Sequence, residues 1–434
     1  MAQTPNLLIK NCKPVGDGFT GSKTMDIRIK NGIIDEISDS LSKSGDEEVF
    51  DAQEAYVSGG WMDMHVHFRE PGFEHKETIE SGCRAASFGG FTEVACMPNT
   101  QPPIHTRDVV EYIKKRSEKE AVEVHPIGCV TKERKGDSIA EMSDMKDGGA
   151  VAFSDDGDPV SSARVMRVAL EYSSMLGMPI INHEEDLELS RPGHMNEGTV
   201  STRLGIEGTP GIAEETMIAR DILLAGFTGG HIHVAHISTR KAVDLVRRAK
   251  AEGIHVTTEV CTHHFDLTDE EIDRRHFDTN VKMHPPLRTR DDVEAMIEGL
   301  QDGTIDVICT DHAPHAIEEK EVEFIYAPNG ITGLETAWSV TVKRLLEPGK
   351  MELTSILEKL VKNPRTILNL SVPVLKHDEP ANLTLFNTHE EWIYSEKEVR
   401  SKSKNSPYLG EMMKGRAVAI YNKGQFVENI LREQ

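Results

Sequence analysis

Two histidines separated by one residue are the first candidates for metal chemistry in this chain. His65 and His67 lie in the apolar run 61–68, and alternate residues of a β-strand share one face. Both imidazoles would then reach a divalent cation at about 2.0–2.1 Å. A single pair of this kind often arises by chance. It gains weight here because a distant apolar run also ends in a ligand type, Asp311.

Other apolar runs end in candidate ligands as well. The runs 150–154, 179–182 and 231–236 end at or just before carboxylates and imidazoles, and this mixture of ligands favours zinc or a similar borderline metal. Six ligands exceed the needs of one tetrahedral zinc, whereas two metals about 3.5–4 Å apart can share a bridging carboxylate. The predicted ligands are His65, His67, Asp156, His183, His236 and Asp311.

Two of these positions have competitors nearby. Asp156 is preferred to Asp155 because it shares strand parity with the small residue Ser154, which suits a crowded interior. His236 is preferred to His231 and His233 because it stands at the extreme end of its run.

The sequence places a further histidine pair, His263 and His264, just after the run 254–260. We expect this pair to support the site or the fold rather than to bind metal.

The elements that must position these residues are repeated βα units. Eight short apolar runs alternate with amphipathic stretches, which predicts a parallel (β/α)8 TIM barrel, and such barrels have their active site at the carboxyl ends of the strands. Ser238 and Thr289 are typical helix N-caps within it. The predicted strands are 61–68, 92–97, 122–129, 150–154, 179–182, 231–236, 254–260 and 305–310.

Segments of alternating apolar and polar residues flank the barrel. Residues 6–57 and about 372–434 contain Asp-Gly, Asn-Gly and Lys-Gly turns, which indicate hairpins. We expect domain bounds of 1–57, 58–371 and 372–434, with a small β-sandwich built from both termini. Two long polar segments, 184–211 and 316–333, are expected to be loops, and the second could close over a ligand.

The composition narrows the classes of partner. Asp and Glu number 72 against 49 Lys and Arg, and the net charge of −23 argues against nucleic acid. No apolar run of membrane length and no leader pattern is visible, so we expect a soluble cytoplasmic protein without a membrane partner. The scattered cysteines, which we expect to be reduced and to bind no zinc, are Cys12, Cys83, Cys96, Cys129, Cys261 and Cys309.

Several motifs resemble one family over essentially the whole chain. They are similar to the signatures of the dihydroorotase family, bacterial type I class, within the amidohydrolase superfamily. The segments are DMHVHFREPG (63–72), MPNT (97–100), HIST (236–239), PPLR (285–288), TDHAPH (310–315) and SKSKNSP (401–407).

The resemblance implies roles for individual residues. It implies two Zn²⁺ per subunit with Asp156 as the bridge, and Asp311 as the residue that transfers the proton. The guanidinium of Arg69 can donate two parallel hydrogen bonds to a carboxylate, so its implied role in binding the substrate carboxylate is chemically reasonable. The implied substrate contacts are His67, Arg69, Asn99, His284, His315, Asn329 and Gly330.

One contact departs from the family pattern. His284 stands where the family would have asparagine. Histidine can still donate a hydrogen bond, but its charge would vary near its reference pKa of about 6.5. We expect the position to keep its role with a changed pH dependence.

The implied activity is the reversible cyclisation of N-carbamoyl-L-aspartate to L-dihydroorotate by zinc-activated hydroxide, the third step of pyrimidine biosynthesis. One alternative is another cyclic amidohydrolase, such as an allantoinase or a dihydropyrimidinase. A second alternative is an inactive scaffold for aspartate transcarbamoylase. The resemblance also suggests a homodimer and aspartate transcarbamoylase as a partner.

Overall fold

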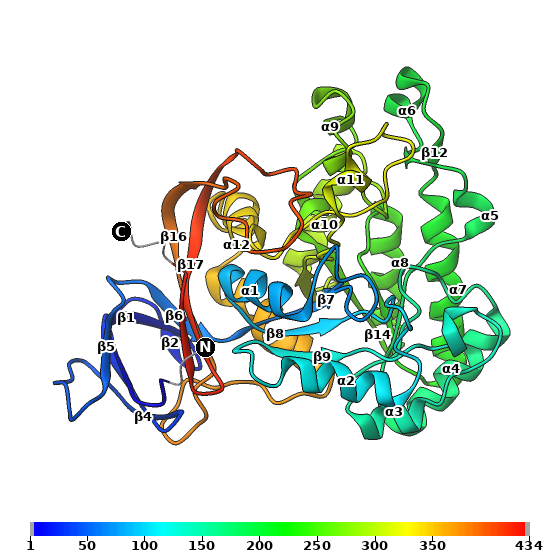
Figure 1. The fold of residues 1–434 in the computed structure, drawn as a ribbon. Coiled ribbons are helices and arrows are strands. Elements are labelled where there is room, and N and C mark those ends of the chain that lie inside the picture. Colours follow the sequence, from blue (N-terminus) through cyan, green and yellow to red (C-terminus); the bar gives the residue numbers. More distant parts are fainter. Residues whose placement is uncertain (1–3, 430–434) are drawn as a thin grey trace.

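The computed structural model describes residues 4–429 and has two parts (Figure 1). A barrel with helices outside it occupies the middle of the chain. A β-sheet lies beside the barrel, and in Figure 1 its blue N-terminal and red C-terminal strands run together.

The barrel is a closed ring of eight parallel segments. Three strands form one parallel sheet and four form another, in the order β10-β13-β14-β15. Parallel bridges at Phe153 join the two sheets on one side, and the bridge between Val66 and His312 joins them on the other. The strands are β7 (Trp61–Val66), β8 (Phe91–Cys96), β9 (Glu123–Pro126), β10 (Ile180–Asn182), β13 (Ile232–Val234), β14 (Val256–Cys261) and β15 (Val307–Cys309).

The fourth segment of the ring differs from the prediction. The run 150–154 was expected to be a strand, but only Phe153 bridges both neighbours, so that expectation is wrong in detail. The run is short: the backbone of Gly128 bonds to Ala152 and Ser154 on one side, and Phe153 alone bonds to Pro179 and Ile181 on the other. The ring is nevertheless complete at this point.

The barrel interior is filled by one apolar cluster. Its members come from seven of the eight ring segments, as expected for side chains that point inward. A register irregularity between Asp63 and Val66 puts Met64 inside, whereas Val66 packs outward against the helices. The inner members are Met62, Met64, Ala95, Met97, Ile127, Ala152, Ile181, Ala235 and Val307, with Ile367 and Leu368 below them.

Helices surround the ring. Thr289 caps α10 as predicted, but the cap of α8 is Thr239 rather than Ser238, whose side chain instead donates to Glu214. The larger helices are α1 (Ile79–Gly89), α2 (Arg107–Ser117), α3 (Met142–Gly148), α4 (Ala163–Leu176), α7 (Ile212–Thr228), α8 (Arg240–Ala251) and α10 (Arg290–Asp302). After the last strand follow α12 (Ala337–Thr341), η4 (Val342–Leu346), α13 (Leu353–Leu357), η5 (Glu358–Lys362) and α14 (Asn363–Ile367).

Short elements lie in the connections above the ring. The segment 184–211, expected to be an irregular loop, contains α5 (Leu187–Ser190), β11 (Met195–Asn196), α6 (Thr199–Leu204) and β12 (Gly208–Thr209). The other short elements are η1 (Lys132–Arg134), η2 (Thr262–Phe265), α9 (Glu271–Arg274), η3 (Thr279–Val281) and α11 (Ile317–Lys320).

Strands from both ends of the chain share one sheet of nine strands. Strand β6 pairs with β1 on one side and with β16 on the other, and so joins the two termini. Trp61 packs at a tilt against Trp338 and Phe386 at the junction with the barrel, with ring centroids 4.8 and 5.0 Å apart. The strands are β1 (Leu7–Gly16), β2 (Phe19–Thr20), β3 (Met25–Lys30), β4 (Ile33–Ser38), β5 (Glu48–Asp51), β6 (Tyr56–Gly59), β16 (Leu383–Ile393), β17 (Met412–Asn422) and β18 (Gln425–Glu428).

Among residues 4–429, no helix is both long enough and apolar enough to cross a membrane.

Candidate metal centre

The carboxyl ends of the barrel strands bring all six predicted ligands into one buried cluster. Their ligand atoms fall into three overlapping groups, each within 4.8 Å, that share His65, Asp156 and His236. Strand β7 supplies His65, His67 follows directly after it, and the loops after the other ring segments supply the rest. The members are His65, His67, Asp156, His183, His236 and Asp311.

His65 is held by a carboxylate that we did not predict. Its Nδ1 lies 2.5 Å from Glu259 Oε1, and both side chains are fully buried. Nδ1 must carry the proton of this bond, so the lone pair of Nε2 faces the cluster. Nε2 lies 3.6 Å from an oxygen of each of Asp156 and Asp311. A histidine that ligates a metal is commonly fixed in this way.

His67 is oriented by an amide. Its Nδ1 donates to Asn99 Oδ1 over 2.8 Å. Its Nε2 then faces Asp311 Oδ1 at 2.9 Å and Asp156 Oδ2 at 3.4 Å. Asn99 therefore fixes the tautomer of a candidate ligand, a role that we did not anticipate for it.

Asp156 lies at the centre of the cluster, and Asp155 does not. Asp156 Oδ1 is 3.2 Å from His236 Nε2 and 3.5 Å from His183 Nδ1. Asp155 turns outward and accepts three bonds from Val130 and Thr131. The parity argument for Asp156 therefore matches the geometry.

The electrostatics of the cluster suit a cation. Burial alone would raise the pKa of Asp311, but His65 and His67 lower it to about 2. Asp156 is likewise shifted well below its usual pKa range, because the nearby histidines outweigh its burial. Both carboxylates are therefore anionic. Among the described residues, the buried Nε2 of His65 has no hydrogen-bond partner, so the donor set fits a divalent metal.

Backbone strain gathers at this centre. Of the non-glycine residues with positive φ, three lie here: Arg69 at 62°, His236 at 30° and Asp311 at 45°. Such conformations are costly and persist where the surrounding structure holds them, often at functional sites. They let the chain turn sharply at the ends of strands and aim these side chains inward.

A cavity of about 270 Å³ opens beside the cluster. Arg69 borders it and donates Nε to the carbonyl of Pro314 over 3.2 Å, which leaves its terminal nitrogens for a ligand. Burial lowers the pKa of Arg69 to about 10, so it stays charged at neutral pH. The predicted residues on the wall are His67, Arg69, Asn99, Asp156, His183, His236, His284, Asp311, His315 and Asn329.

Two of the predicted substrate contacts are tied into the protein. His315 Nε2 donates to the carbonyl of Asn329 over 2.8 Å, and Lys76 Nζ lies 3.4 Å from Nδ1. Among the described residues, Gly330 does not line the cavity, and its N–H donates to the backbone carbonyl of Lys282. A side chain at Gly330 would collide with the ring of His315, so this glycine allows close packing beside the cavity.

His284 shares a carboxylate with a candidate ligand. Glu185 Oε1 is 2.9 Å from His284 Nε2, and Glu185 Oε2 is 3.3 Å from His183 Nε2. Burial lowers the pKa of His284 although Glu185 opposes this. The unpredicted residues Glu185 and Glu259 left one signal in the sequence, namely a charged side chain next to or within an apolar run.

His231 and His233 lie outside the cluster, as expected. Both bond to Thr257 Oγ1, at 2.7 and 2.8 Å. His233 also lies 3.5 Å from Glu259, on the far side of that carboxylate from the cluster.

Comparisons with known proteins agree with the architecture. A family model described as "Dihydro-orotase-like" matches residues 56–242. The L-hydantoinase (dihydropyrimidinase) of Arthrobacter aurescens has a TM-score of 0.86 over 99% of this chain and 98% of that one. Its identity of 24% shows a common fold alone.

Relatives in sequence are much closer. A protein named dihydroorotase from Citrifermentans bemidjiense is 47% identical over 97% of this chain and 99% of the relative. Another, from Caldanaerobacter subterraneus, is 47% identical over 94% of each chain. The chain therefore belongs to the dihydroorotase family.

Proposed function

We propose that this protein catalyses the reversible cyclisation of N-carbamoyl-L-aspartate to L-dihydroorotate. One observation carries the proposal: a buried His/Asp cluster shares a cavity wall with the Arg69 guanidinium. The cluster suits the amide chemistry and Arg69 suits the substrate carboxylate. The dihydroorotase family membership supports the same activity.

Individual residues of the chain would have separate roles in this reaction. Arg69 would bind the carboxylate, and Asn99 would keep His67 in the tautomer that presents Nε2. A bound divalent metal would polarise the ring carbonyl and lower the pKa of water. Asp311 would accept a proton on Oδ1 in the hydrolytic direction and return it to the leaving ring nitrogen. Its low pKa keeps the carboxylate ready to accept that proton.

We infer that the cofactor is two Zn²⁺ with Asp156 as the bridge. The two oxygens of Asp156 face different partners, which supports this assignment. Oδ1 lies nearest His236 and His183, whereas Oδ2 lies nearest His67.

We further propose the finer organisation predicted from the sequence. The bounds 1–57, 58–371 and 372–434 are supported by the pairing of β6 with β16, and this terminal sheet would fold on itself as a β-sandwich. A homodimer, or a complex with aspartate transcarbamoylase, is supported by exposed apolar side chains on α4 and α7. Met175, Leu223 and Phe227 are 84%, 73% and 72% exposed.

A substrate panel tests the activity. Zinc-loaded protein should open dihydroorotate and cyclise N-carbamoyl-L-aspartate, and should act far more slowly on dihydrouracil, which is a similar ring without the carboxylate. Replacement of Arg69 by Met should raise KM for dihydroorotate and leave the residual rate on dihydrouracil unchanged. Equal rates on both rings would instead favour a dihydropyrimidinase-like activity, and no turnover of either would favour a scaffold.

A further inference from the structure

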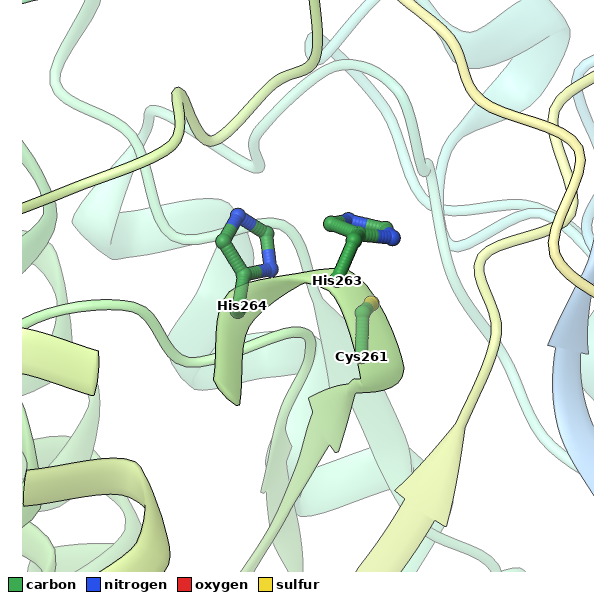
Figure 2. Close-up of side chains that lie close together, drawn as sticks. All are labelled: Cys261, His263 and His264. Carbon is green, nitrogen blue, oxygen red and sulfur yellow. The ribbon is translucent and has the colours of Figure 1, made fainter. Parts of the chain in front are cut away.

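A second group of metal-ligating side chains follows strand β14. Cys261 ends the strand, and His263 and His264 lie on the 3-10 turn η2. Figure 2 shows Cys261 where the strand meets the turn and the two histidines on the turn itself. One ligand atom from each lies within 4.8 Å of the others, and all three residues are buried. This group shares no residue with the His/Asp cluster.

The polar atoms of this group lack partners. Within residues 4–429, both ring nitrogens of His263 lack a hydrogen-bond partner, and Nδ1 of His264 also lacks one. Buried polar atoms are almost always satisfied in native proteins, so three unpaired nitrogens on adjacent residues require an explanation. A cation that accepts one lone pair from each ring would account for two of them.

The tautomer of His264 is suited to a metal. Its Nε2 lies 2.9 Å from the backbone carbonyl of Pro285, so Nε2 carries the proton and Nδ1 carries the lone pair. A metal-bound histidine commonly donates its other nitrogen to a carbonyl in this way.

The protonation states are also suitable. Burial lowers the pKa of His263 to about 4 and that of His264 well below its usual value, so both rings are neutral at pH 7. Burial raises the pKa of Cys261 to about 11, so its sulfur keeps a proton until a cation displaces it.

We propose that Cys261, His263 and His264 bind one Zn²⁺, or a similar borderline divalent cation, at a site separate from the His/Asp cluster. On binding, the S–H bond of Cys261 breaks, the proton leaves to solvent and a sulfur–metal bond forms without any change of oxidation state. Thiolate and imidazole are the ligands that zinc prefers. This assignment revises the expectation that none of the cysteines binds zinc.

A second sulfur lies beside the proposed site. Cys309 is the register partner of Cys261 on β15, and the two sulfur atoms are 3.6 Å apart. The proposed site is also connected to the cavity beside the His/Asp cluster. His264 donates to the backbone carbonyl of Pro285, and the preceding residue, His284, borders that cavity.

Cobalt provides a direct test because only sulfur ligands give a strong near-ultraviolet charge-transfer band with Co²⁺. The His/Asp cluster contains no sulfur, so the band would report a cysteine ligand, and the Cys261→Ser variant shows whether that ligand is Cys261. The metal-free full-length protein, loaded with Co²⁺, should show the band and release one proton for the thiol. Cys261→Ser should abolish the band and lower bound cobalt by one ion per chain. Cys12→Ser, which removes a buried thiol of the terminal sheet, should keep both.

The assignment would be overturned if the loaded protein showed no such band or if the band survived in Cys261→Ser. If Cys261→Ser does not fold, as judged by circular dichroism, His263→Gln decides the matter. That variant should lose at least tenfold in affinity for the cobalt that gives the band, and an unchanged affinity would refute the site. Neither result bears on dihydroorotate turnover, so this proposal and the proposed activity can fail independently.

Discussion

In both His65 and His67, the ring nitrogen Nδ1 is hydrogen-bonded to a neighbouring side chain and Nε2 points towards the cluster. Glu259 and Asn99 fix these tautomers from behind. The orientation of these candidate ligands therefore depends on side chains outside the cluster, and mutations there should affect metal affinity before anything else.

The Glu259→Gln variant tests this dependence. Glutamine keeps the size of the side chain but loses the charge that holds His65, so zinc affinity should fall by about 10- to 100-fold. Competition with a chromophoric chelator measures it. The exposed Glu252→Gln variant is the matched control and should bind zinc normally. Unaltered affinity in Glu259→Gln would show that Glu259 does not support the centre.

Asp311→Asn separates proton transfer from metal binding. The amide can still coordinate through its oxygen but cannot accept the proton, so turnover of dihydroorotate should drop by about 10²- to 10⁴-fold. Metal analysis of the same sample should show near-normal content. Substantial remaining turnover would remove Asp311 from the proton-transfer role.

The spacing of residues could locate the candidate ligands because strand ends in a closed barrel converge on one face. Asp156 could be separated from Asp155 by parity for the same reason. Glu259 and Glu185 escaped prediction because their roles depend on which neighbouring strand or loop they face. Asn99 was predicted to contact the substrate, and it borders the cavity. Its hydrogen bond to His67 depends on side-chain geometry that residue spacing does not reveal.

At the scale of the elements, a buried ion pair ties the lower part of the barrel together. Glu93 on β8 accepts from Arg365 on α14 over 2.9 Å and from Asn382 over 2.8 Å, and it lies 2.9 Å from His125 on β9. Arg365 is fully buried. Four separate segments therefore depend on one carboxylate.

The Glu93→Gln variant should be strongly destabilised. It leaves the buried charge of Arg365 uncompensated, which typically costs about 3–5 kcal/mol. Urea unfolding at pH 7 measures the change in the free energy of unfolding. In the control, Glu80→Gln breaks the exposed pair with Arg84 and should change stability by no more than about 0.5 kcal/mol. Similar losses in both variants would contradict a special role for Glu93.

The same pair predicts a pH dependence. Burial would raise the pKa of Glu93, but His125 and Arg365 lower it from 4.5 to about 2. Because the folded pKa lies below the unfolded one, the stabilisation is complete above pH 4.5 and is lost as the pH falls towards about 2. The stability difference between wild type and Glu93→Gln should therefore shrink between pH 5 and 3, as repeated urea titrations would show.

The elements themselves were predictable to different degrees. Seven of the ring strands arise within the predicted apolar runs or one residue beyond them, because a parallel strand buried on both faces needs a continuous apolar stretch. The run 150–154 was too short for the rule to distinguish a strand from a bridging residue. Ser238 and Thr239 are both good caps, and only the bond from Ser238 to Glu214 decides between them.

On the scale of the whole molecule, metal and fold should be linked. The cluster joins β7 to the loops after four other ring segments, so a cation that binds only the folded chain stabilises it. Removal of metal with a chelator should lower the free energy of unfolding, by about 2.7 kcal/mol relative to protein in free zinc at 100 times Kd. Thermal unfolding with and without added zinc checks this. Identical melting curves would mean that the cluster holds no metal.

The sheet shared by both termini has a consequence for biosynthesis. Trp61 donates its backbone N–H to Thr384, 323 positions further along the chain. As the ribosome releases the protein from its N-terminus, β6 emerges long before its partner β16 exists. The edge of β6 that pairs with β16 therefore stays unpaired while the barrel is synthesised. Because exposed edges invite aggregation, a nascent chain stalled before β16 should be a preferred client of chaperones.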